Sequence, residues 1–262
     1  SVCIAPDGKS IVTGGFDAKA IIYHLASGVK ISNIESTPGT VCHATFINKG
    51  KKILSAGYDG RICFLDKNYG LIKHSRGSER TPVYALSIND WKGVLALSTY
   101  SQGVKILDFK SGQLLQKLET NPSSTDDVVL SQSAQYIYTA DYNSKVWEVE
   151  TGKWHRGYFA QNDINCIAIS RDGRDMFSGS SDKSIHRWSI EDANKRMINE
   201  GHKDEVKDIL LNSDETQLYS CSADGSLRAL DVVTGLCLKT TICSNDYLWA
   251  VEYYPNRKTL LT

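Results

Sequence analysis

The stretch Gly201–Asp231, GHKDEVKDILLNSDETQLYSCSADGSLRALD, contains two of the three markers of a unit that recurs along this chain. Three apolar residues open it, Val206, Ile209 and Leu211, with two residues and then one residue between them. The same spacing recurs at Val41-Ala44-Phe46, Val83-Leu86-Ile88, Thr125-Val128-Leu130, Ile164-Ile167-Ile169 and Leu248-Val251-Tyr253. The first residues, 41, 83, 125, 164, 206 and 248, are 42, 42, 39, 42 and 42 positions apart. A period in this range indicates a solenoid, a propeller or an array.

A turn residue recurs in phase with this apolar triad. Its copies are Asp17, Asp59, Ser101, Asn143, Asp182 and Asp224, which are 42, 42, 42, 39 and 42 positions apart. Such residues favour tight turns because their side chains bond to nearby backbone groups or because they tolerate positive φ. Short apolar runs flank each turn, as Ile53-Leu54 and Ile62-Cys63-Phe64-Leu65 do around Asp59. Two such runs around a short turn predict a β-hairpin.

A third marker, a glycine turn, closes the unit. It falls at Gly28, Gly70, Gly112, Gly152 and Gly235, and a less regular run such as Leu114–Leu118 follows it. Each repeat therefore predicts four short strands, and no segment has the sustained 3.6-residue apolar period of a helix. We predict an all-β fold, a seven-bladed β-propeller of four-stranded antiparallel blades.

The expected domain organisation is one propeller over residues 1–262, with six repeats essentially complete and the seventh truncated. The expected repeats are approximately 1–38, 39–80, 81–122, 123–161, 162–203 and 204–245, with a partial repeat at 246–262. We expect the chain to be a piece of a longer seven-bladed protein. The alternative is an open ring that a partner strand closes, since an unpaired sheet edge invites strand addition.

The chain resembles the WD-repeat β-propeller family over its whole length. Repeat six carries the motif best, with Gly201-His202, Ser220, Asp224 and Leu230-Asp231, and repeat five has Trp188 after Ser178-Gly179-Ser180-Ser181-Asp182. In that family a hydrogen-bonded His, Asp, Ser/Thr and Trp often lock a blade. The resemblance implies such a structural network at His202, Ser220 and Asp224 in repeat six, and at Ser178, Asp182 and Trp188 in repeat five.

The repeats also depart from the family pattern. The position of the tryptophan is occupied by Tyr23, Leu65, Leu107, Val149, Trp188 and Leu230. No repeat holds all four network residues, so we expect the blades to depend more on apolar packing between sheets. In repeat four, counting back from Gly152 would instead place Trp147 in this position. We prefer the alignment on Asn143 because it keeps the 42-residue spacing.

Composition excludes several classes of function. Lys+Arg and Asp+Glu both number 30, so the net charge is zero, which argues against a general binder of nucleic acid or of membrane surfaces. No apolar stretch approaches the roughly 20 residues that span a bilayer. The seven cysteines, without a Cys-x-x-Cys pair, are typical of small core residues in a reducing compartment. We expect a cytoplasmic protein, with a nuclear location left open.

Motifs that carry chemistry are scarce. The six histidines have no metal-ligand spacing, and the chain has no phosphate-binding glycine loop, nucleophile elbow or paired-acid motif. The sequence therefore predicts no enzyme, no cofactor and no metal. A propeller enzyme stays an alternative, because catalytic groups from different blades leave no local motif.

The best functional candidates are aromatic residues that precede the predicted turns. They are Phe16, Tyr58, Tyr100 and Tyr142, and Ser181 and Ala223 take this position in repeats five and six. In a propeller this turn lies on the top face, around the channel mouth, and aromatic side chains are enriched at binding hot spots. Packing of these rings over the neighbouring blade is an equally weighted alternative.

A loop on the same expected face contains Arg156, Tyr158 and Phe159. Arginine pairs with planar anions, so these residues would cap an acidic or phosphorylated segment. A surface loop with a locally packed aromatic pair, or an aromatic cage for a methylated lysine, are the alternatives.

We therefore predict a non-enzymatic scaffold that binds a peptide or protein loop on its top face, within a multi-subunit complex. The alternative is an architectural subunit that uses its rim or its open last blade. Propeller enzymes and nucleic-acid readers are weaker candidates.

Overall fold

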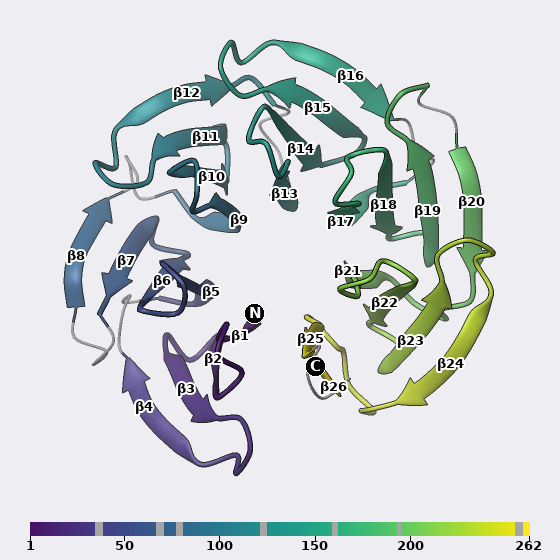
Figure 1. Ribbon diagram of the computed structural model, residues 1–262, viewed down its shortest axis with the longest axis horizontal. Helices are drawn as coiled ribbons and strands as arrows, with labels where there is room; N and C mark the ends of the chain where they lie inside the picture. The colour runs from purple at the N-terminus through teal and green to yellow at the C-terminus, as the bar shows by residue number, and fades with distance from the viewer. Residues whose placement is uncertain are drawn as a thin grey trace.

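The computed structural model describes residues 1–34, 39–66, 71–76, 81–120, 125–158, 162–192, 195–254 and 259–262. Within these residues the regular structure is entirely β, in six four-stranded antiparallel sheets and one two-stranded sheet. Figure 1 shows the sheets arranged as blades around a central axis, with the first strand of each blade innermost. The prediction of an all-β propeller with a partial seventh blade is confirmed.

Each blade is a meander of strands that follow one another in the sequence. Blades one to three comprise β1 (Val2–Ile4), β2 (Ser10–Gly14), β3 (Ala20–His24), β4 (Lys30–Ile34); β5 (Val41–Ile47), β6 (Lys52–Gly57), β7 (Arg61–Leu65), β8 (Leu71–Arg76); and β9 (Val83–Asn89), β10 (Val94–Thr99), β11 (Gly103–Asp108), β12 (Leu114–Leu118). Blades four to six comprise β13 (Asp127–Leu130), β14 (Tyr136–Ala140), β15 (Ser144–Glu148), β16 (Trp154–Tyr158); β17 (Ile164–Ile169), β18 (Asp175–Ser180), β19 (Ser184–Ser189), β20 (Lys195–Glu200); and β21 (Val206–Leu211), β22 (Gln217–Ser222), β23 (Ser226–Asp231), β24 (Cys237–Ile242).

The partial seventh blade consists of β25 (Glu252–Tyr254) and β26 (Thr259–Leu261). Its first strand contacts β1, so blade seven lies beside blade one (Figure 1).

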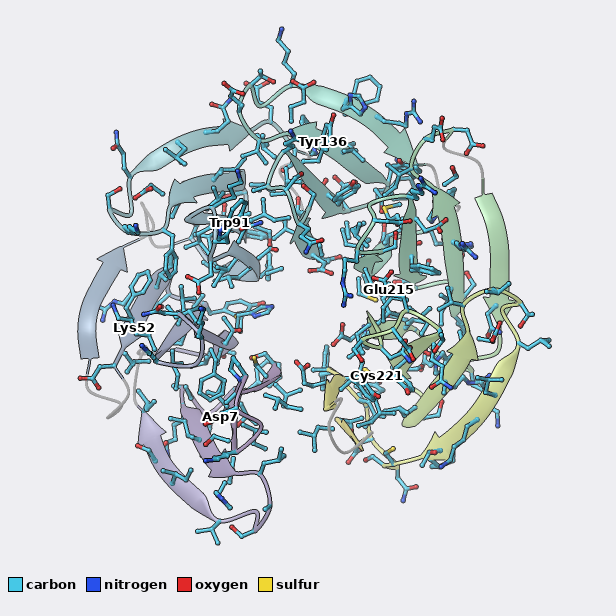
Figure 2. The ribbon with its side chains drawn as sticks, in the orientation of Figure 1. Asp7, Lys52, Trp91, Tyr136, Glu215 and Cys221 are labelled. Atoms are coloured by element: carbon cyan, nitrogen blue, oxygen red, sulfur yellow. The ribbon has the colours of Figure 1, made fainter. Side chains whose placement is uncertain are left out.

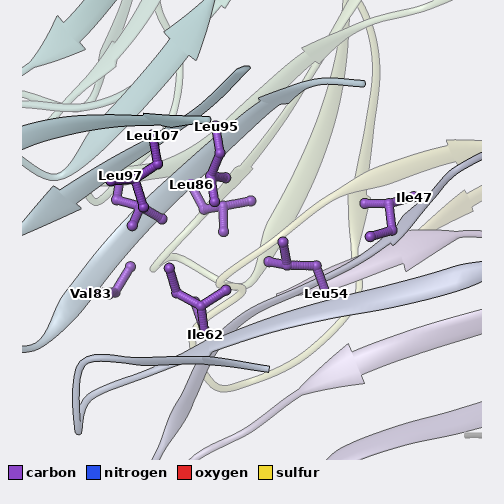
Figure 3. Packing of buried hydrophobic residues seen from close by; sticks show 9 residues of the cluster. Ile47, Leu54, Ile62, Val83, Leu86, Leu95, Leu97 and Leu107 are labelled. Atoms are coloured by element: carbon purple, nitrogen blue, oxygen red, sulfur yellow. The ribbon is translucent and has the colours of Figure 1, made fainter. Parts of the chain in front are cut away.

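The apolar triad forms the core between blades. Six clusters of buried hydrophobic residues lie between successive blades, and each takes side chains from two sheets. Figure 3 shows one of them, where Leu54 and Ile62 of blade two face Leu97 and Leu107 of blade three. A single sheet cannot bury both of its faces, so each blade depends on its neighbours for its core.

A repeated irregularity identifies the position that the family gives to tryptophan. The pairing of the third strand with the fourth shifts register immediately before one residue of every four-stranded blade. These residues are Tyr23, Leu65, Leu107, Trp147, Trp188 and Leu230. A β-bulge at a constant place increases the local twist in the same way in each blade. The bulge therefore marks structurally equivalent residues independently of the sequence alignment.

Our alignment of repeat four is wrong by this criterion. Trp147, and not Val149, follows the bulge. The turn residue is Asp141 and not Asn143, because the Asp141 carboxylate accepts the backbone N–H of Asn143 at 2.8 Å. The reason is a shorter hairpin. Thr139 pairs with Lys145, which leaves five residues between them (145 − 139 − 1). In blade five the equivalent pair, Ser178 and His186, leaves seven (186 − 178 − 1).

The cysteines fit the expectation of core residues only in part. Cys63, Cys166 and Cys221 are buried, whereas Cys237 and Cys243 are exposed at and beyond β24. None of the seven, all of which lie within the described residues, forms a disulfide.

No helix in the described part of the chain is long and apolar enough to cross a membrane.

Packing between blades can be tested at Leu97, which is 1% exposed in the cluster between blades two and three. We expect Leu97→Ala to lower the free energy of unfolding by about 2–5 kcal/mol, because it leaves a cavity between two sheets. Leu115→Ala is the control, since Leu115 on β12 is 51% exposed, and should cost less than about 1 kcal/mol. Urea denaturation measures both, and equal losses would contradict the proposed core.

Candidate protein-interaction face

One end of the propeller carries both the turns between second and third strands and the connections between blades. Antiparallel meanders place these segments at the same end, and hydrogen bonds tie them together. The backbone N–H groups of Tyr58, Tyr100 and Ala223 donate to the carbonyl oxygens of Thr40, Pro82 and Glu205, each at 2.9 Å. We call this end the interaction face.

The aromatic residues predicted from the sequence are exposed there. Phe16 is 77% exposed, Tyr58 44%, Tyr100 50% and Tyr142 57%. Three of them occupy one repeat position, because they precede Asp17, Asp59 and Ser101. Tyr142 does not, because it follows the turn aspartate Asp141 in the shortened hairpin of blade four. The predicted series of four equivalent residues is thus corrected to three equivalent residues and one exposed neighbour.

Two further aromatic residues extend this surface. The ring of Tyr84 lies between those of Tyr58 and Tyr100, with centroids 5.6 and 6.0 Å apart and both contacts edge-to-face. Trp249 lies 6.3 Å from Phe16, also edge-to-face. We call Phe16, Tyr58, Tyr84, Tyr100 and Trp249 the aromatic sector. Edge-to-face pairs of aromatic rings contribute interaction energy beyond that of the apolar area that they bury.

Sequence reasoning missed Tyr84 and Trp249, although a periodic signal was present. Both come directly after the first residue of the apolar triad. This position holds Cys42, Tyr84, Asp126, Asn165, Lys207 and Trp249 in successive blades. Since the triad begins the innermost strand, this position surrounds the central axis at the interaction face.

The other side of the face is polar and mainly acidic. Asp126 and Asp163 are exposed, and Glu205 forms an ion pair with Lys207. Partial burial and the negative charge of Asp163 raise the pKa of Asp126, an effect that Lys207 opposes. We call Asp126, Asp163 and Glu205 the acidic sector.

The residues predicted in the loop after blade four behave differently from expectation. Tyr158 is 1% exposed, and its hydroxyl donates to the carbonyl oxygen of Ile190 at 3.1 Å. The Arg156 guanidinium donates to the same carbonyl at 2.9 Å and to that of Glu191. The prediction that Tyr158 contacts a partner is therefore wrong in this structure, because Tyr158 packs against Trp188 of blade five. Phe159 lies outside the described residues.

In blade six the structure brings together the three residues expected to form a network. His202 Nε2 lies 2.8 Å from Ser220 Oγ, and His202 Nδ1 lies 3.2 Å from Asp224 Oδ2 and 3.0 Å from Ser226 Oγ. Burial lowers the pKa of His202. Burial alone would raise the pKa of Asp224, but hydrogen bonds from Ser226 and from the backbone of Lys203 lower it.

In blade five the three residues expected to form a network, Ser178, Asp182 and Trp188, take part in two separate sets of contacts. Trp188 donates its indole N–H to Ser178 Oγ at 2.9 Å. Asp182 contacts the Ser184 hydroxyl and lies 3.5 Å from the Nε2 of His186. A histidine from the third strand, which the sequence pattern did not indicate, therefore stands near the turn aspartate. Blade four repeats the first contact, from Trp147 to Thr139 at 3.2 Å.

Half-buried carboxylates connect neighbouring blades near the central axis. Asp127 accepts the backbone N–H of Ile167 in blade five at 2.9 Å, and Asp208 accepts that of Val251 before blade seven at 2.9 Å. Burial raises the pKa of Asp127 to about 7 and that of Asp208 to about 6. Each carboxylate supplies an acceptor to a backbone group that would otherwise lack one, so these residues have a structural role.

Within the described residues, no group of three or more His, Cys, Asp or Glu side chains is arranged to hold a metal ion.

Comparison with known proteins agrees with this architecture. The sequence model of the WD domain, G-beta repeat, matches residues 152–189 and 194–231. WD repeat-containing protein 1 of Xenopus tropicalis is 24% identical over 94% of this chain and 34% of its own length. Autophagy-related protein 16 of Arabidopsis thaliana is 25% identical over 70% of the chain and 36% of its own length. The chain thus spans about a third of the length of these two relatives.

Target of rapamycin complex subunit LST8 of Mus musculus is 21% identical over 87% of the chain and 73% of its own length. The fold, the two matched repeats and these relatives support a diverged WD-repeat β-propeller.

The network of blade six gives a test by substitution. We expect Asp224→Ala to lower the free energy of unfolding by about 2–3 kcal/mol, because two backbone N–H groups and His202 lose a charged acceptor. Asp214→Ala is the control, since Asp214 also accepts a backbone N–H, from Thr216, but in an exposed turn. Urea denaturation should show a clearly smaller loss for Asp214→Ala, and an equal loss would argue against a special role for the network.

The connecting carboxylates predict how stability depends on pH. The folded-state pKa of Asp127, about 7, lies above its ordinary value of 3.8, so the folded protein holds more protons between these values. Stability contributed by this group is therefore lost as pH rises through that window. Asp127→Asn removes this loss and keeps an oxygen acceptor. Between pH 5 and pH 8 the variant should gain about 1–2 kcal/mol relative to the wild type, allowing for residual solvation.

Thermal and urea unfolding at a series of pH values measure this difference. Glu150→Gln, at an exposed position, should follow the wild-type profile. A constant difference between Asp127→Asn and the wild type at all pH values would contradict the assignment.

Proposed function

We propose that this chain is a non-enzymatic interaction scaffold that binds a peptide or protein loop across the interaction face. The observation that carries this proposal is the aromatic sector. Its rings form two edge-to-face groups, Phe16 with Trp249 and Tyr84 with Tyr58 and Tyr100, and all of them except the half-buried Tyr84 are exposed. Exposed aromatic side chains that gather on one surface favour a binding site, because they offer a large contact area at low entropic cost.

The rigidity of the backbone beneath these rings supports the proposal. Tyr58 and Tyr100 each donate a backbone hydrogen bond to the connection between blades, and the turn of Tyr58 is fixed by Asp59, which accepts the N–H of Arg61 at 3.1 Å. Tyr84 lies on strand β9 itself. Little conformational freedom would be lost on binding, which favours affinity.

The comparisons support an interaction role rather than catalysis. WD-repeat propellers are generally non-catalytic, and one relative is by its printed name a subunit of a complex. We extend that character to this chain as part of the proposal, with a protein partner inside a multi-subunit complex.

A second candidate is an architectural subunit that is bound at its rim. The outer strands expose apolar side chains, among them Leu114 and Leu115 on β12 and Leu238 and Ile242 on β24. Such side chains are the surface that a neighbouring subunit would cover.

A comparative capture experiment separates the two candidates. The first variant, called the top-face variant because its four substitutions lie on the interaction face, combines Phe16→Ser, Tyr58→Ser, Tyr100→Ser and Trp249→Ser. The control removes four exposed apolar side chains elsewhere, with Trp91→Ser in the turn between β9 and β10 (Figure 2), Leu115→Ser, Trp154→Ser and Leu238→Ser. Both variants must match the wild type in melting temperature.

We expect the top-face variant to lose a specific protein partner by at least about tenfold, because hot-spot aromatic residues contribute 2 kcal/mol or more each, while the control retains it. Quantitative mass spectrometry of proteins captured from extract measures the loss. If the control loses the partner and the top-face variant keeps it, the rim is the binding surface.

A further inference from the structure

The residues that directly follow the first triad residue surround the central axis at the interaction face. One of them, Lys207, is a cation that lies between a carboxylate and an aromatic ring. Lys207 Nζ lies 5.3 Å from the centroid of the Trp249 ring, and the same ammonium pairs with Glu205. The three residues come from the start of blade six and the segment before blade seven. An aromatic face and a carboxylate together stabilise a cation by the ring quadrupole and by direct charge.

Across the central axis, blades three to five also present an aromatic ring, Tyr84, and two carboxylates, Asp126 and Asp163. No cation lies at the equivalent inner positions there. Tyr84 occupies in blade three the position that Trp249 has before blade seven, and Asp126 occupies in blade four the position of Lys207. Asp126 and Asp163 are exposed, and no ion pair involves either one among the described residues. Two turn cations of blades four and two are already paired, Lys145 with Asp141 and Arg61 with Asp59, both at 3.2 Å, and Lys105 of blade three donates to Gln102.

The electrostatics of Tyr84 and Asp126 agree with their proximity. Burial and the hydrogen bond with Tyr58 raise the pKa of Tyr84 to about 12, and the charge of Asp126 adds to this effect. Burial and the negative charge of Asp163 raise the pKa of Asp126, Lys207 opposes this effect, and Asp141 adds to it. A positive charge placed between the Tyr84 ring and these carboxylates would relieve that repulsion.

We propose that the corner formed by Tyr84, Tyr100, Asp126 and Asp163 binds an arginine or lysine side chain of a basic protein segment. The inference rests on the proposed function and specifies the chemistry of its partner. The cation would lie against the tyrosine rings and would pair with the two aspartates, as Lys207 lies against Trp249 and pairs with Glu205. The remaining aromatic sector would contact the apolar part of the same segment.

A defined probe tests this proposal. The probe is a fluorescein-labelled peptide of twelve residues in which three arginines alternate with Gly and Ser, and the comparison peptides carry Glu or Leu in place of Arg. Asp126→Asn with Asp163→Asn removes the two carboxylates. Asp7→Asn with Glu150→Gln makes the same change in net charge at exposed positions away from the corner, and Figure 2 labels Asp7 in the turn before β2.

Fluorescence anisotropy at low salt should show that the arginine peptide binds the wild type more tightly than either comparison peptide. Binding should weaken roughly tenfold in the Asp126→Asn, Asp163→Asn variant, because two charge pairs are lost, and by less than about twofold in the control. Tyr84→Phe should retain binding, whereas Tyr84→Leu should weaken it about threefold, because only phenylalanine keeps an aromatic face. Added salt should weaken the wild-type complex.

Several results would overturn the proposal. They are equal binding of the arginine and glutamate peptides, no binding of the arginine peptide, or equal weakening in the corner variant and the control. If the leucine peptide binds best and binds more weakly to the top-face variant, the proposal of a docking site on this face is supported. The proposal that the partner segment is basic is then rejected. Loss of docking itself is judged separately by the capture experiment.

Discussion

The structure depends on apolar packing between neighbouring blades. Each sheet presents hydrophobic side chains on both faces, and six clusters between successive blades bury them. Because every contact of this kind joins a blade only to its neighbours, stability is distributed around the ring and not gathered in one centre. The polar networks of blades four, five and six supplement this packing. Blade five has all four residue types in Ser178, Asp182, His186 and Trp188, but its histidine comes from the third strand.

The order of the blades and their four strands could be predicted from the sequence, because the apolar triad reports directly which residues face the neighbouring sheet. Local exceptions to the 42-residue period were not predicted from the sequence. The 42-residue spacing favoured Asn143 and Val149, whereas the bulge and the turn hydrogen bond identify Asp141 and Trp147. A constant period assumes equal hairpins, whereas the hairpin of blade four is shorter. Counting back from Gly152 indicated Trp147 correctly, but the 42-residue period was given more weight.

The candidate site was only partly predictable for a related reason. Phe16, Tyr58 and Tyr100 share a visible repeat position, so the sequence indicated them. Tyr84 and Trp249 also share a position, but their period is filled by Cys, Asp, Asn and Lys in the other blades, and only the folded ring brings these residues around one axis. The burial of Tyr158 depends on a carbonyl of the next blade, which no local pattern encodes.

The shortened hairpin of blade four also shows how such a ring accommodates change in chain length. Two residues are missing from this hairpin, yet the bulge, the tryptophan position and the packing against both neighbours are retained. The change in length is therefore absorbed within one blade: repeat four spans 39 residues, and the 42-residue spacing resumes from repeat five onward. The height and composition of the interaction face can vary blade by blade during evolution, while the ring beneath keeps its geometry.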